Sequence, residues 1–198
     1  MKLLKTLLAS AVAVSAMPAL AYEAGDFMIK AGVINVNPKE DNINLGGGVK
    51  AQVADDTQLG LTFTYMVMPQ VGVEVLAATP FKHSVTLNGD RVATTKHLPP
   101  TVSAQYYFMD PASQIQPYVG LGVNHTFFFD EDGVAPHLKK SWGLAYSLGV
   151  NYDIDEHLMA NVALWKMDID SEIDGGALDG TDVEIDPLVF MVGAGYKF

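Results

Sequence analysis

The last twelve residues of the chain, Pro187 to Phe198, alternate strictly between two kinds of side chain. A period of two predicts a strand with two different faces. One face begins with larger apolar residues, continues with Gly193 and Gly195, and ends in Lys197. The other face is wholly apolar and consists of Leu188, Phe190, Val192, Ala194, Tyr196 and Phe198. Because an open apolar edge strand invites aggregation, the pattern favours a closed barrel in which this strand pairs with the first strand.

The N-terminus has the features of a secretory signal peptide. Lys2 and Lys5 form a basic start, residues 7–16 form a short apolar run, and Ala19-Leu20-Ala21 is a small-x-small cleavage site. An N-terminal membrane helix is the alternative, which the short run and the small residues disfavour. We therefore expect residues 1–21 to be removed and residues 22–198 to form one barrel domain that begins at Tyr22.

Composition narrows the class of the remaining chain. After residue 21, ten basic residues stand against 23 acidic ones, a formal charge of −13, which argues against nucleic acid as a partner. The chain has no cysteine, which excludes disulfides and thiol chemistry. Although 49% of the residues are hydrophobic, no run after residue 21 approaches the ~18 apolar residues of a transmembrane helix. This combination is typical of a transmembrane β-barrel.

Eight segments have the alternation and the length of strands that cross a bilayer at a tilt. They are about Asp26–Val36, Thr57–Met66, Val71–Phe81, Pro100–Met109, Ile115–Phe128, Ser141–Tyr152, Leu158–Ile169 and Asp186–Phe198. Their connections alternate between short turns and long loops, as in outer-membrane barrels. We predict an all-β fold, an eight-stranded antiparallel transmembrane β-barrel, in the cell outer membrane with both termini in the periplasm.

The two faces of the strands distinguish a membrane barrel from a soluble one. In residues 141–152, for example, Trp142, Leu144 and Tyr146 share one face, whereas Ser141 and Gly143 lie on the other. Large apolar side chains on one face and small or polar ones on the other suit a lipid-facing surface around a narrow lumen. A soluble, lipocalin-like barrel stays open as an alternative, because a register slip of one residue exchanges the faces.

Charged and polar residues on the inward faces predict a lumen polar network. A charge within a membrane span is expected to face the lumen and to find a partner. Lys30, Glu74 and Gln105 meet this condition, and Lys197 is a further candidate. The favoured interpretation is structural, a plug of the periplasmic half, since buried ion pairs need not have a function.

Two large apolar residues, Leu76 and Trp165, also fall on inward faces. A polar lumen does not need a tryptophan, so the two could form an apolar channel constriction. Packing of the barrel interior explains them equally well. Their spacing leaves both interpretations open.

The remaining motifs predict no chemistry. The acidic segment 168–186 departs from the calcium-loop pattern, so it is expected to be a solvated loop, with loose divalent binding that bridges to lipopolysaccharide as the alternative. The five histidines form no metal-binding motif, and no serine lies in a nucleophile elbow. We therefore expect no catalytic residue, no metal and no cofactor, and a protein that is not an enzyme.

Several longer motifs resemble those of the outer membrane protein W (OmpW) family. They cover essentially the whole chain after the signal peptide and comprise Thr57–Met66, Val73–Phe81, His97–Pro100, Gln116–Gly120, Trp165–Asp170 and Asp186–Phe198. The placement of Tyr196 and Phe198 also resembles the assembly signal of outer-membrane barrels, which implies the barrel-assembly machinery as a partner. The loop Phe129–Lys140 is shorter than the family pattern.

The resemblance implies a function. It implies an outer-membrane channel for passive uptake of small hydrophobic molecules through a narrow apolar lumen, with lateral release into the membrane and with alkane importers among its relatives. It also implies that a leucine and a tryptophan close the channel, at the positions of Leu76 and Trp165. Outer-membrane lipid, lipopolysaccharide and small hydrophobic solutes are the implied partners. The alternative function is a sealed structural barrel or a surface receptor for colicins or phage.

Overall fold

Most of the described chain is β-strand. The structure is a computed structural model that describes residues 21–39, 51–133, 137–176 and 179–198. Its strands are β1 (Phe27–Asn37), β2 (Ala51–Val53), β3 (Asp56–Met68), β4 (Val71–Ala78), β5 (Phe81–Leu87), β6 (Asp90–Leu98), β7 (Thr101–Tyr107), β8 (Ile115–Gly133), β9 (Ser141–Asp153), β10 (Leu158–Met167), β11 (Asp170–Glu172), β12 (Asp182–Glu184) and β13 (Leu188–Lys197). No helix in these ranges is long and apolar enough to cross a membrane.

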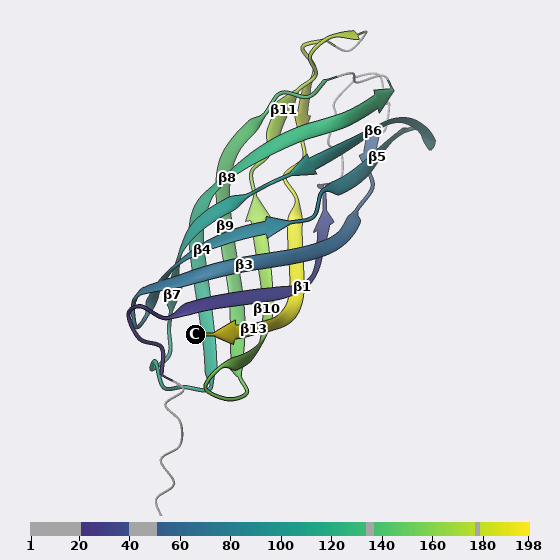
Figure 1. The fold of residues 1–198 in the computed structure, drawn as a ribbon. Helices are drawn as coiled ribbons and strands as arrows, with labels where there is room; N and C mark the ends of the chain where they lie inside the picture. The colour runs from purple at the N-terminus through teal and green to yellow at the C-terminus, as the bar shows by residue number, and fades with distance from the viewer. Residues whose placement is uncertain (1–20, 40–50, 134–136, 177–178) are drawn as a thin grey trace, which may run out of the picture.

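Eight of the strands close into an antiparallel barrel, as predicted (Figure 1). The ring runs β1-β3-β4-β7-β8-β9-β10-β13, and the last strand pairs with the first, with Val33 opposite Val192. Short turns join β3 to β4, β7 to β8 and β9 to β10 at one end, here called the turn end, where the C-terminus also lies (Figure 1). The opposite end, here called the loop end, carries the longer connections.

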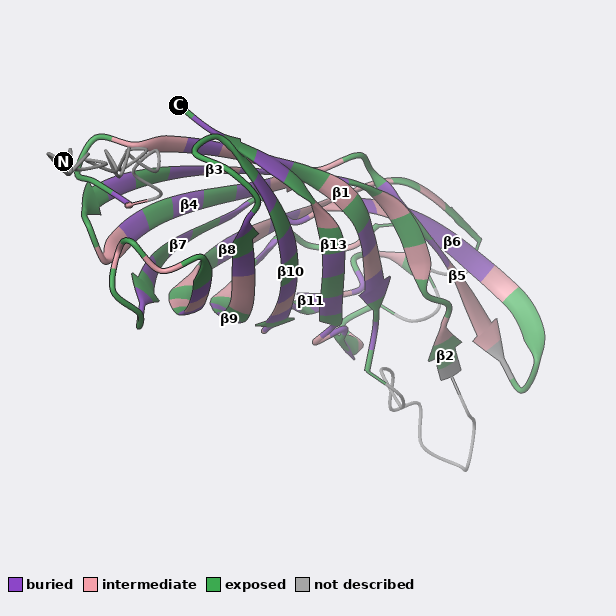
Figure 2. Ribbon diagram, turned by 90° about the horizontal axis from the view of Figure 1, so that it is seen from below, coloured by how far each residue is buried: buried purple, intermediate pink, exposed green. Residues whose placement is uncertain are grey.

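Burial alternates along the barrel strands with a period of two (Figure 2). The apolar set faces outward: Trp142 is 71% exposed and Leu59 is 67% exposed. The small and polar set, including Thr64, Ser103 and Asn151, is buried inside. This arrangement is the one expected of a membrane barrel rather than of a soluble barrel with an apolar interior.

The loop end differs from the sequence prediction. The third predicted strand was expected to reach Phe81, but β4 ends at Ala78, and the chain bends at Thr79 and Pro80 because proline cannot donate a ladder hydrogen bond. The segment Lys82–Pro99 was expected to be a loop, but most of it lies in the β5–β6 hairpin. β8 extends beyond its predicted end at Phe128 to Gly133, because β6 offers it a further partner strand there.

Candidate functional site

A buried ion pair lies inside the lumen toward the turn end. The Nζ atom of Lys30 on β1 donates to Oε2 of Glu74 on β4 at 2.7 Å, and the two side chains are 0% and 1% exposed. Thr64 on β3 donates to the same carboxylate oxygen at 3.2 Å. The lysine stem fits because position 195 is a glycine: a Cβ there would lie 2.7 Å from Cγ of Lys30. Two of the predicted network residues are thus bonded directly to each other.

A second polar cluster lies beside the ion pair. Gln105 accepts a hydrogen bond from the Tyr107 hydroxyl at 2.8 Å, so its described partner is a tyrosine and not the ion pair. Asn161 donates to Asn151 at 2.7 Å and to the Tyr118 hydroxyl at 3.2 Å. Tyr118 joins the two clusters, since Nζ of Lys30 lies 5.2 Å from the centre of its ring. We call these two clusters together the polar plug.

Lys197 lies apart from the polar plug, at the turn-end mouth. Its Nζ atom donates to the carbonyl oxygen of Ala21 at 3.0 Å and lies 3.9 Å from Oδ2 of Asp26. The structure therefore separates this further candidate from the Lys30–Glu74 pair. Among the described residues, no group of three or more histidine, aspartate or glutamate side chains is placed to hold a metal ion.

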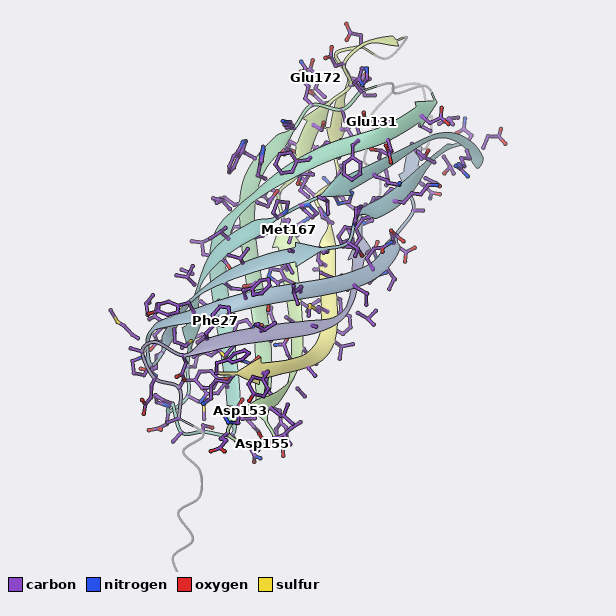
Figure 3. All side chains as sticks on the ribbon, viewed as in Figure 1. Phe27, Glu131, Asp153, Asp155, Met167 and Glu172 are labelled. Carbon is purple, nitrogen blue, oxygen red and sulfur yellow. The ribbon has the colours of Figure 1, made fainter. Side chains whose placement is uncertain are left out.

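Toward the loop end the lumen is apolar and nearly filled. A cavity of about 10 Å³, here called the upper cavity, is lined by Ile34, Val36, Leu76, Ala77, Ala78, Phe81, Pro99, Met167 and Val189. This volume holds roughly one water molecule. Figure 3 shows Met167 in the middle of the barrel, well away from Asp153 at the turn end. The lumen thus has a polar lower part and a constricted apolar upper part.

The two residues of the predicted constriction occupy different places around the upper cavity. Leu76 is 3% exposed and lines the cavity directly. Trp165 is 1% exposed and lies on β10 in register with Val189, which lines the cavity from β13. Met167 also lines the cavity, and its sulfur atom accepts a hydrogen bond from the Thr101 hydroxyl at 3.9 Å. Both predicted residues therefore belong to the apolar upper part, and their role as a gate stays a prediction.

The barrel wall beside the upper cavity, here called the thin wall, consists of small residues that pair with β3 but not with β7. Ala77 and Ala78 line the upper cavity and also line a dent of about 360 Å³ between β1, β3 and β4, here called the outer dent, which exposed Leu59 helps to form. The β4–β7 ladder ends at Leu76 and Thr101, so the two alanines lie beyond it. Pro99, just before β7, lines the cavity at this gap.

An aromatic stack roofs the upper cavity in the β5–β6 hairpin, beyond the ends of β4 and β7. The rings of His83 and His97 are stacked with their centres 4.8 Å apart, and Phe81 and Phe128 flank His97 at 5.4 and 6.0 Å. Nδ1 of His83 donates to the Ala54 carbonyl oxygen at 2.5 Å. Burial first, and then the neighbouring His83, lower the pKa of His97 to about 3. The His97 imidazole is therefore neutral in the folded hairpin near pH 7.

Sequence reasoning missed several lumen residues. Tyr118 and Phe81 carry no signal beyond their places in the predicted strands. Met167 falls on the same inward face as Trp165, but it was not predicted to be part of the constriction. Tyr22 was predicted only as the first residue after cleavage, but its side chain is 1% exposed and lies within the turn-end mouth. Only the closure of the barrel brings these residues to the lumen.

The comparisons with known proteins agree with this architecture. The model of the OmpW family matches residues 23–198. Outer membrane protein W of Escherichia coli (strain K12) is 44% identical, with 98% of this chain and all of that protein covered. Outer membrane protein AlkL of Ectopseudomonas oleovorans is 28% identical, with 89% and 84% covered.

Solved structures extend the likeness to three dimensions. The crystal structure of the outer membrane protein OprG from Pseudomonas aeruginosa superposes with a TM-score of 0.79 at 45% identity, over 90% of this chain and 98% of that one. The family match spans the whole barrel, including the ion pair, the upper cavity and the thin wall. This chain therefore belongs to the OmpW family of outer-membrane β-barrel proteins.

Proposed function

We propose that this protein is an outer-membrane channel for passive uptake of small hydrophobic molecules, with lateral release into the membrane. The observation that carries the proposal is the order of parts along the lumen. An apolar upper cavity lies above a polar plug, and two alanines line both the cavity and the outer dent. The apolar side chains that line the upper cavity support a hydrophobic solute. The proposed topology has both termini in the periplasm, and the function involves no bond chemistry.

The driving force is hydrophobic transfer. A solute that enters the upper cavity gains ~25 cal/mol for each Å² of apolar surface removed from water, or ~0.8 kcal/mol per methylene group. Since the cavity is only about 10 Å³, a solute must displace the side chains of Leu76 and Met167 to pass. The polar plug below would leave an apolar solute beside buried charges, so the wall at Ala77 and Ala78 is the favoured exit.

Truncation of the constriction tests this function. Trp165→Ala and Leu76→Ala are expected to raise uptake of a small apolar probe about tenfold, a barrier change of about 1.4 kcal/mol, because both remove apolar bulk at or beside the upper cavity. Uptake is measured in vesicles whose outer leaflet is lipopolysaccharide, against protein-free vesicles. Trp142→Ala, on the lipid-facing surface, is the matched control.

The second candidate function is a sealed structural barrel or a surface receptor, which the buried Lys30–Glu74 pair within the lumen favours. In that case the folded wild-type protein passes no probe. The truncations at Leu76 and Trp165 would then change only stability, and this outcome would reject the channel.

A change in the thin wall tests lateral release. Ala78→Leu is expected to lower uptake about tenfold or more, since overpacking at a filled site costs ~1–3 kcal/mol and Ala78 lines the upper cavity. The same probe and vesicles serve for the measurement. Ala104→Leu is the control, because Ala104 faces outward on β7 in register with Val73 of β4, away from the cavity. Equal uptake by both variants would place the exit elsewhere.

A further inference from the structure

The segment before β1 inserts one aromatic ring into the turn-end mouth of the lumen. The side chain of Tyr22 is 1% exposed although it precedes the first strand. Its hydroxyl donates to Oδ1 of Asp153 at 3.3 Å and accepts from Asn151 at 3.0 Å. Its ring meets the Tyr107 ring edge-on, with centres 5.3 Å apart. Nζ of Lys197 lies 5.1 Å from the ring centre.

These partners come from separate sides of the barrel. Tyr107 belongs to β7, Asn151 and Asp153 to β9, and Lys197 to β13. A ring that touches three strands so far apart around the barrel lies across the mouth and not along one wall. In the proposed topology this mouth opens into the periplasm.

The backbone holds the ring in place without belonging to the barrel ladder. The backbone nitrogen of Tyr22 donates to the Pro111 carbonyl oxygen at 3.0 Å, and the nitrogen of Gly25 donates to Met66 at 2.8 Å. Gly25 has φ +104°, a conformation that favours glycine, and this lets the chain turn back from the mouth into β1. The segment is thus a short anchored strap and not a ninth strand.

We propose that Tyr22 is a stopper that closes the turn-end mouth below the polar plug. This role goes beyond the proposed function, which concerns the upper cavity and its wall. The stopper separates the buried Lys30–Glu74 pair from periplasmic water. It also belongs to a part of the chain that can move without breaking any barrel strand pair.

Signal-peptide cleavage after Ala21 is compatible with the stopper. Cleavage turns the Tyr22 nitrogen into an ammonium group, which still donates to the Pro111 carbonyl. Cleavage removes the Ala21 carbonyl acceptor of Lys197, whose ammonium group already lies 3.9 Å from Asp26. The ring keeps its contacts with Tyr107, Asn151 and Asp153, so the processed chain carries its stopper as its first residue.

Cysteine accessibility tests the stopper, because the natural chain has no cysteine. Met159→Cys places a thiol inside the mouth, since Met159 is 1% exposed and pairs with Asp153, the partner of the Tyr22 hydroxyl. The rate of labelling by a small water-soluble methanethiosulfonate is measured in folded, processed protein in lipid vesicles. Tyr22→Ala is expected to raise this rate about tenfold, equivalent to about 1.4 kcal/mol of opening free energy.

Two further variants keep the test specific. Tyr22→Phe keeps the ring and is expected to label at close to the wild-type rate. Tyr65→Ala removes a half-exposed, lipid-facing tyrosine from β3 and is expected to have no effect. Equal labelling of Tyr22→Ala and wild type, in protein shown to be folded by its heat-dependent shift in gel mobility, would overturn the proposal. The uptake assay is independent, so a failed channel function would leave the labelling result unchanged.

Discussion

Glu74→Leu is expected to lower the free energy of unfolding by about 3–5 kcal/mol. The change leaves the Lys30 ammonium group buried without the carboxylate that lies 2.7 Å away in the wild type. Thr64 would lose its acceptor as well, and the Tyr118 ring at 5.2 Å offers only a cation–π contact in return. A buried charge without a counter-charge is among the most costly features of a folded chain, so a large effect is expected.

The double variant Lys30→Met with Glu74→Leu separates two costs. One is the cost of a buried charge without a counter-charge, and the other is the loss of the ion pair itself. Two apolar side chains of similar volume avoid the buried charge, so most of the lost stability is expected to return. The free energy of unfolding of the wild type, the single variant and the double variant is measured by reversible guanidinium unfolding in lipid vesicles. The fluorescence of Trp142 and Trp165 reports the transition. Val75→Leu, on the outward face of the same strand, is expected to stay within about 0.5 kcal/mol of wild type. A double variant as unstable as the single one would show that the two charges do not act as a pair.

The closed barrel and its faces followed from local pattern. Alternation in Leu188–Phe198 was enough to predict closure onto β1, and the inward faces of Lys30, Glu74, Leu76 and Trp165 followed from the same period of two. A period of two assigns a side chain to the lumen wherever the strand boundaries are right, because adjacent residues point to opposite faces. Much of the site was therefore visible before any contact was known.

The contacts within the lumen did not follow from pattern. Which inward polar group meets which depends on the stagger between strands and on strands distant in sequence. Gln105 was grouped with Lys30 and Glu74, yet its described bond is to Tyr107, two residues along its own strand. The bend at Thr79 and Pro80 also looked like the continuation of a strand, although the proline marks where the ladder stops. These features depend on tertiary pairing, which no single segment encodes.

Acidification is expected to loosen the β5–β6 hairpin. The pKa of His97 is about 3 in the folded hairpin, against an ordinary value of about 6.5, because the ring is buried between Phe81 and Phe128 and beside His83. In the opened hairpin, His97 is therefore protonated below pH ~6.5. In the closed hairpin, it is protonated only below pH ~3. The closed form is fully favoured above pH ~6.5 and loses about 1.4 kcal/mol per pH unit between these limits.

The charged groups around the aromatic stack do not reverse the lowering of the histidine pKa values. Asp56 on β3 and Asp55 before it favour protonation of His83, but burial outweighs them and lowers the pKa of His83 as well. On β6 and β8, Lys96 and Asp130 pair with each other at 2.9 Å, and their side chains are 38% and 64% exposed. Lys82 follows Phe81 on β5, and its side chain is exposed. Burial of the two stacked imidazoles therefore determines that both pKa values are lowered and that acid destabilises the closed hairpin.

Amide hydrogen exchange measures this effect directly. From His97 alone, moving from pH 8 to pH 5 is expected to destabilise the closed hairpin by about 2 kcal/mol, so that its amides exchange about 30-fold faster after correction for intrinsic rates. The amides of β9 serve as an internal reference. His97→Phe should remove this contribution, whereas His157→Phe, at the turn end, should retain it. Because Phe81 of this hairpin lines the upper cavity, a loosened hairpin also frees the roof of that cavity. If the proposed function holds, apolar uptake should rise over the same pH interval. Exchange in β5 and β6 that does not change with pH would contradict the role of the buried histidines.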